Sequence, residues 1–194
     1  LYVLFLGCSM SPDKSKKVPY STNNTNPSFP VQKDVKSQKG FSVSKGFIKA
    51  DDKTVLELLI GSSLLLNMSA EEQLEAVIRL KDNTEVYVKE NSLNNEENIM
   101  INKSELGPSK QLLEVFTSQF KDLSSSMLIE GVEMRLINSG FGNYQNRFEY
   151  VFFNSLFKTA ELERYSYQYF ISVNKENFHI VINTKEGLEI QDVF

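Results

Sequence analysis

The sequence predicts a domain of the α+β class, in which an amphipathic helix precedes a meander of antiparallel strands. Leu112, Phe116 and Phe120 recur every four residues, which places them on one face of a helix over residues 109–123. Aromatic strand candidates follow, and short polar loops typical of hairpins separate them: 147–154, 163–174 and 178–183. The whole domain is expected over residues 46–194, a length sufficient for one hydrophobic core.

The first part of this domain leaves helix and strand open. Two apolar runs, 55–60 and 63–66, lie on either side of Gly61, and their periodicity does not separate the two states. A polar loop rich in Asn and Glu is expected over residues 91–98.

Residues 69–80 also allow two interpretations. Ser69-Ala-Glu-Glu72 is a capping-box pattern, and apolar residues at helical spacing follow it. The same stretch can form a hairpin in which residues 76–80 pair with residues 84–88 through a turn at 81–83.

Beyond the helix, we expect a strand over Met127–Ile137 and a glycine-rich turn over Asn138–Asn143. Alternation then divides the last strand between two faces. The inward set is Phe178, Ile180 and Ile182, with His179 and Val181 on the other face.

Aromatic side chains concentrate in this meander, where residues 148–178 hold ten of the chain's 22 aromatics. Alternating residues share one face of a sheet, which groups Tyr165, Tyr167 and Tyr169. These tyrosines either pack under the helix, with their hydroxyls at the rim, or form an amphipathic platform for a peptide, glycan or protein partner. Two cations border this candidate binding face, Arg147 and Arg164.

Searches for catalytic and cofactor motifs give no candidate residues. His179 is the only His, and no Gly-x-Ser-x-Gly motif accompanies it. Gly140-Phe-Gly142 lacks the third glycine of a dinucleotide-binding loop. One Cys and one His cannot build a Cys/His zinc site, so no metal or cofactor is predicted. The many carboxylates are expected on solvated faces.

The N-terminal part of the chain differs in composition from the domain. Residues 9–45 hold eight Ser, seven Lys, two Asp and four of the five Pro, with few core-forming side chains. Such a segment cannot bury enough apolar surface to offset its ordering entropy, so we expect a disordered tether over residues 8–45, including Cys8. Its net charge is +5 in a chain of −4, which leaves −9 for the remainder.

The first residues resemble a bacterial lipoprotein signal. Residues 1–7 form an apolar run typical of a signal-peptide remnant, and Phe5-Leu6-Gly7-Cys8 resembles a lipobox. This resemblance implies cleavage before Cys8, diacylglycerol on its thiol and an acyl chain on its new amino group. The alternative is a conventional signal peptide or a membrane-helix remnant with an incidental Cys.

The order of elements resembles the PsbP-like and DcrB-like lipoproteins: an amphipathic helix, a strand, a turn, and a meander ending at Thr184. The similarity covers roughly residues 84–184. It implies an α/β/α sandwich on a mainly antiparallel sheet, with strands at 84–88 and 63–67. It also implies a closing helix after Thr184, of which residues 185–194 would be only the beginning, so we expect truncation there.

Together these features predict a bacterial cell-envelope lipoprotein whose domain is a non-catalytic binding or assembly module. Its partners would be the membrane, through the lipid anchor, and an envelope protein or glycan. A net charge of −4 gives no reason to expect nucleic acid. By analogy with the sorting of enterobacterial lipoproteins, the lipobox resemblance implies that Ser9 after Cys8, in place of Asp, favours the outer membrane or cell surface over the inner membrane. The alternatives are a carboxylate-dependent hydrolase of envelope polymers and a spacer without a ligand.

Overall fold

The fold is described from a computed structural model of the chain. It describes residues 37, 39–43, 45–63, 70–92, 95–129, 133–144, 147–160 and 162–187. Cys8, the residues before it and most of the predicted tether lie outside this part of the chain, as do Ser69 and the predicted closing helix at 188–194.

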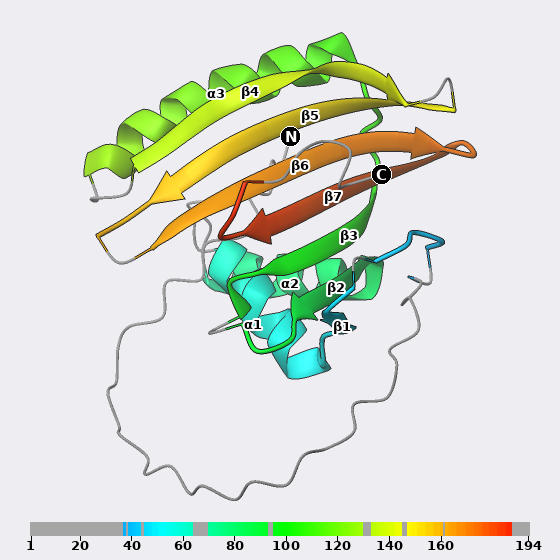
Figure 1. The fold of residues 1–194 in the computed structure, drawn as a ribbon, viewed down its shortest axis with the longest axis vertical. Helices are drawn as coiled ribbons and strands as arrows, with labels where there is room; N and C mark the ends of the chain where they lie inside the picture. Colours follow the sequence, from blue (N-terminus) through cyan, green and yellow to red (C-terminus); the bar gives the residue numbers. More distant parts are fainter. Residues whose placement is uncertain are drawn as a thin grey trace, which may run out of the picture.

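The described residues form one seven-stranded antiparallel sheet in the order β1-β2-β3-β7-β6-β5-β4 (Figure 1). After β3 the chain crosses to the far edge and returns as a meander, so that β7 pairs with β3. The α+β class with an antiparallel sheet is therefore confirmed. The strands are β1 Phe47–Lys49, β2 Thr84–Lys89, β3 Asn98–Ser104, β4 Glu133–Tyr144, β5 Phe148–Lys158, β6 Glu163–Val173 and β7 Glu176–Thr184.

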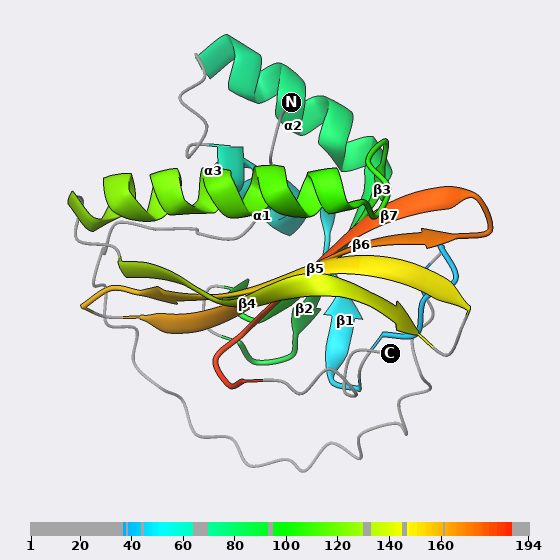
Figure 2. The same ribbon diagram turned by 90° about the horizontal axis from the view of Figure 1, so that it is seen from above.

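Three helices cover one face of the sheet: α1 Asp52–Ser63, α2 Ala70–Asn83 and α3 Lys110–Ile129 (Figure 2). The first two pack over β2, β3 and β7, where Leu59, Val77 and Met100 are fully buried. Helix α3 packs over β4, β5 and β6 through the predicted stripe of Leu112, Phe116 and Phe120. The hydrophobic core on this face is thus divided between two helical groups.

The described parts of both ambiguous segments are helical. The apolar residues of 55–60 belong to α1, whose first turn is capped by Asp51 Oδ1, which accepts from the Thr54 amide at 2.8 Å. The hairpin alternative for residues 76–80 is wrong, because α2 continues to Asn83 and buries Val77 against β2 and β3. The predicted strand at 84–88 is confirmed as β2. Of the strand implied at 63–67, Ser63 ends α1 and the rest lies outside the described residues.

Helix α3 is longer than predicted. Ser109 Oγ accepts from the Leu112 amide at 3.0 Å and caps its start. The helix then continues through Ser124–Ser126 to Ile129, so residues 127–129 are not part of a strand. Neither Gly nor Pro interrupts the segment, and Ser weakens a helix too little to end it.

The predicted turn at Asn138–Asn143 is also wrong, because these residues continue β4. Its glycines are explained by the neighbouring strand. A Cβ atom at Gly142 would lie 2.3 Å from Tyr150 Cζ, and one at Gly140 would lie 3.0 Å from Phe152 Cε1. The aromatic rings of β5 therefore occupy the space that side chains at these two positions would need.

The opposite sheet face carries an apolar cluster that includes residues from before β1. Phe41 contacts the Phe178 ring edge-on at a centroid distance of 5.1 Å, and Val43 is buried in the same cluster. Packing of the domain therefore begins within the segment predicted as a tether, ahead of residue 46. The buried members are Val43, Phe47, Tyr87, Ile99, Ile101, Tyr150, Tyr167, Tyr169, Ile171, Phe178, Ile180 and Ile182.

Candidate functional site

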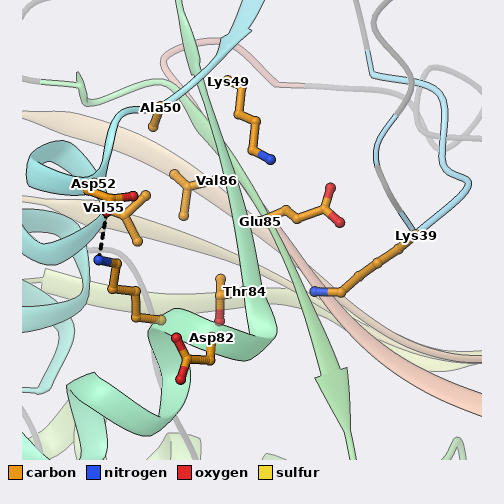
Figure 3. A pocket seen from close by; sticks show the side chains of 10 residues that line it. Lys39, Lys49, Ala50, Asp52, Val55, Asp82, Thr84, Glu85 and Val86 are labelled. Atoms are coloured by element: carbon orange, nitrogen blue, oxygen red, sulfur yellow. Dashed lines mark hydrogen bonds and ion pairs between the residues drawn. The ribbon is translucent and has the colours of Figure 1, made fainter.

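A cavity of about 240 Å³ opens where β1 ends beside β2 (Figure 3). Strand β1 pairs only with Tyr87–Lys89, and the Ala50 amide, which donates to Val86 O at 2.9 Å, marks the point where the chain leaves β2 for α1. On the β1 side, the first half of β2 is therefore flanked by side chains instead of a strand, while its other side pairs with β3. The lining residues are Lys39, Lys49, Ala50, Asp52, Val55, Lys81, Asp82, Thr84, Glu85 and Val86.

Several charged groups of the cavity are engaged within the protein. Lys81 Nζ lies 2.8 Å from Asp52 Oδ2 and joins α2 to α1. Lys39 Nζ donates to Ile101 O at 3.1 Å and also to Asn83 O. Glu85 Oε2 accepts from the Tyr87 hydroxyl at 2.7 Å. These contacts hold the walls of the cavity in place.

Burial shifts the pKa of two of these groups. It lowers the pKa of the Lys39 amine below its usual value, and the negative charge of Glu85 offsets part of this effect. Burial raises the pKa of the Tyr87 hydroxyl, and its hydrogen bond to Glu85 raises that pKa further. Tyr87 therefore remains a neutral donor to Glu85 at physiological pH.

Two further charged side chains line the cavity and are not held by contacts of this kind. Lys49, from β1, and Asp82, near the C-terminal end of α2, are both exposed, and Figure 3 shows them at the top and bottom of the cavity. Within the described part of the chain, neither makes an ion pair or a side-chain hydrogen bond. The cavity thus offers a ligand one ammonium and one carboxylate.

A row of buried polar residues crosses four strands on the helical face. The register aligns Ser155 with Ser166, Ser166 with Asn183, and Asn183 with Asn98. Asn183 Nδ2 donates to Asn98 Oδ1 at 2.8 Å, and Asn98 Nδ2 donates to Asn95 O at 2.9 Å. This row is enclosed, whereas charged side chains exposed to solvent line the cavity beside β2. The cavity is therefore the better candidate for a ligand site.

His179 and Val181 lie on the sheet face opposite Phe178, Ile180 and Ile182, as alternation predicts, and this is the helical face. Both faces of the strand are buried, so the expected inward set is not the only buried one. His179 is buried, its ring stacks on Phe170 at a centroid distance of 4.2 Å, and Nε2 lies 3.1 Å from Gln168 Oε1. Burial lowers its pKa to about 3. A neutral, enclosed imidazole has a structural role, in agreement with the absence of a Ser-His motif in the sequence.

The predicted tyrosine face is formed, but away from the helices. Tyr165, Tyr167 and Tyr169 share the face opposite α3, so they do not pack under that helix. Tyr169 is fully buried, Tyr167 is buried and Tyr165 is half-buried. Burial also raises the pKa of the Tyr169 hydroxyl. Most of the tyrosine surface is therefore used in the apolar cluster of the opposite face.

The two predicted arginines do not join these tyrosines. Arg164 precedes Tyr165 in β6, so its side chain lies on the helical face, where it is buried. Arg147 is exposed in the turn between β4 and β5, where its amide donates to Tyr144 O at 2.8 Å. The structure therefore places the five residues of the predicted face in three different environments, and Cys8 lies outside the described residues.

The sequence alone gave no signal for most of the cavity. Lys39 belongs to the predicted tether, and the other lining residues come from segments that only the sheet topology brings together. Glu85 is the one lining residue that the sequence can indicate, because it places a charge in an otherwise uncharged strand candidate. Among the described residues, no cluster of His, Cys, Asp and Glu is suited to a metal ion, and no helix has the length and apolarity to cross a membrane.

Comparisons with known proteins find similarity among solved structures only. The sequence matches no family model and none of the curated proteins. A similar chain path occurs in the solution structure of cyanobacterial PsbP (CyanoP) from Synechocystis sp. PCC 6803. The two sequences are 13% identical, the match covers 79% of this chain and 80% of that one, and the TM-score is 0.47. No conclusion about function follows from it.

Proposed function

We propose that the protein is a bacterial cell-envelope lipoprotein, anchored through acyl groups on Cys8, whose domain binds a ligand without transforming it. The observation that carries the binding function is the cavity beside β2, where side chains from the N-terminal segment, β1, α1, α2 and β2 converge. Its internal ion pair and hydrogen bonds fix the walls, while Lys49 and Asp82 remain available to a ligand.

The chemistry of the cavity favours a compact ligand with both an anionic and a cationic group. Its volume of about 240 Å³ lies just below the range of about 300–1,000 Å³ that is typical of drug-sized ligands. A ligand carboxylate would pair with Lys49, and a ligand ammonium would pair with Asp82. Free amino acids and the ends of short peptides have this combination of charges.

The hydrolase alternative has one observation in its favour, since Asp52, Asp82 and Glu85 all line the cavity. Glycoside hydrolysis requires one carboxylic acid and one carboxylate on either side of the bond. Two of the three groups are engaged instead, Asp52 by Lys81 and Glu85 by Tyr87. This arrangement favours binding over acid–base chemistry.

The anchor proposal rests on the lipobox-like residues Phe5–Cys8 and the lysine-rich segment after them. Two or more acyl chains give stable attachment, whereas one gives only marginal binding. We expect the full-length protein to fractionate with membranes and the Cys8→Ser variant to become soluble. A variant that stays membrane-bound to the same extent would contradict lipidation, and Ser9→Cys in the Cys8→Ser background controls for the position of the thiol.

Ligand binding can be tested by calorimetry on the full chain carrying Cys8→Ser, with glycylglycine and its N-acetylated and C-amidated forms as probes. We expect glycylglycine to bind best, because only this form has both charges. Lys49→Ala and Asp82→Asn should each weaken binding about five- to tenfold, as expected for one charged hydrogen bond at a half-exposed site. Lys53→Ala, on the exposed side of α1, is the control. Equal affinities for all probes, or no effect of either substitution, would contradict the proposal.

A further inference from the structure

Strand β4 is a long edge strand of the sheet. It has 12 residues and pairs only with β5 among the described strands, so its outer row of backbone groups has no described strand beside it (Figure 1). Natural proteins commonly protect such an edge with charges, Pro or a bulge. Here a bulge between Leu136 and Asn138 shifts the register with β5, and the stretch from Asn138 to Tyr144 contains neither charge nor Pro.

This regular stretch also exposes an aromatic ring at its centre. Phe141 is the middle residue of Asn138–Tyr144 and is 42% exposed. It is paired with Val151, which places its side chain on the helical face, outside the core cluster beneath α3. On the other face of the strand, Gly140 and Gly142 lie beneath the rings of Phe152 and Tyr150. The stretch is therefore uncharged on both faces and exposes one aromatic ring at its centre.

We propose that β4 pairs with β4 of a second copy of this chain, antiparallel and with the two-fold axis at Phe141. This register uses the whole regular stretch on both chains. It opposes Phe141 with Phe141, Gly140 with Gly142, Ser139 with Asn143, and Asn138 with Tyr144. Cross-strand aromatic pairs stabilise antiparallel strands, and no like charges face each other across this pairing.

A second copy of the chain is the favoured partner for this edge because the stretch Asn138–Tyr144 is complementary to itself. An isologous interface requires each residue to face the image of another residue of the same patch. Two exposed rings at the axis cover each other, and the paired glycines add no bulk to the opposite face. The resulting sheet would run continuously through both copies, with fourteen strands, twice the seven strands of one chain.

The register can be tested by crosslinking in the full chain carrying Cys8→Ser, so that no other thiol is present. Phe141→Cys should give a covalent dimer with a short bis-maleimide. Ser139→Cys and Asn143→Cys should crosslink in a mixture of the two variants, and only weakly when each is alone. Crosslinking of Ile48→Cys, which lies on the opposite sheet edge and is 39% exposed, would instead indicate pairing through β1 and would overturn the proposal.

Sedimentation equilibrium tests whether the dimer exists. The Cys8→Ser chain should dimerise, and Phe141→Lys should raise the dissociation constant at least about tenfold, because each dimer then opposes two charges at its axis. Ile48→Lys is the matched control and should leave the constant unchanged. Phe141 is exposed, so the variant should remain folded, which circular dichroism can verify. A monomeric parent chain, or a dimer that tolerates Phe141→Lys, would overturn the proposal.

Discussion

The ring of His179 lies flat on the ring of Phe170, with centroids 4.2 Å apart and planes 7° from parallel. The pair joins β7 to β6 on the helical face, between the cluster under α3 and the cluster under α1 and α2. Gln168 Oε1 lies 3.1 Å from the imidazole Nε2. Because no described residue places a charge beside it, protonating this imidazole would put an uncompensated charge in the core.

We therefore expect stability to fall as the pH drops below about 6.5 and to continue falling toward pH 3. The folded pKa of His179 is lowered to about 3, so between these values the unfolded chain binds the extra proton. The contribution of this one proton to the free energy of unfolding is at most about 1.4 kcal/mol per pH unit. Urea unfolding at pH 7 and pH 4.5 should show a smaller difference for His179→Gln than for the parent. Equal differences would contradict this assignment.

The bond between Asn183 and Asn98 predicts a coupled effect on stability. Asn183→Leu leaves Asn98 Oδ1 buried without its donor, which should cost about 1–3 kcal/mol. The double variant Asn98→Leu, Asn183→Leu should cost less than the sum of the single variants, because neither amide is left without its partner. Denaturant unfolding of all four chains measures the coupling. Gln111→Leu, at an exposed position of α3, is the control.

Gly142 cannot be enlarged without moving Tyr150. The Cβ of Gly142→Ala would lie 2.3 Å from Tyr150 Cζ, so we expect a loss of about 1–3 kcal/mol from overpacking. Adding Tyr150→Leu should recover part of the loss. Gly187→Ala meets its nearest atom, the Tyr167 hydroxyl, at 3.6 Å and should be nearly neutral. Equal melting temperatures for the two alanine variants would contradict the clash.

Phe41 should hold the segment before β1 on the sheet. Phe41→Ala removes the contact with Phe178 and should cost about 1–3 kcal/mol, less than a fully buried ring because Phe41 is half-buried. The Phe41 amide, which donates to Ser37 Oγ at 2.9 Å, should then exchange faster with deuterium. Ile78→Ala, at an exposed position of α2, should leave both properties unchanged.

Strong periodicity allowed the sequence to predict α3 and the meander of β5, β6 and β7, including the placement of His179 opposite Phe178 and Ile180. Strand β3 was not predicted. It lies between β2 and β7 and is buried on both faces over Asn98–Asn102, so it has no alternation of polar and apolar residues. The glycines of β4 predict a turn when the sequence is considered alone, because the neighbouring rings that require them are distant in the sequence.

The candidate site was harder to predict than the fold. Alternation correctly grouped Tyr165 with Tyr167 and Tyr169, but it does not say which sheet face the helices cover. It likewise does not show that Arg164 is buried on the other face. The cavity depends on where β1 stops along β2, which is a property of strand pairing between segments about 40 residues apart and leaves no local pattern.

The contacts of the segment before β1 also determine how the domain would respond to tension from its N-terminal side. The Lys39 amine donates a hydrogen bond to a carbonyl of β3, and the Phe41 ring contacts β7, so both side chains hold the segment before β1 to interior strands of the sheet. A pulling force must break these contacts before it reaches the three residues of β1. A force applied at the N-terminal side would therefore act on β3 and β7 first. It would reach β1 only after the contacts of Lys39 and Phe41 are broken, so these contacts protect the short edge strand from being pulled off the sheet.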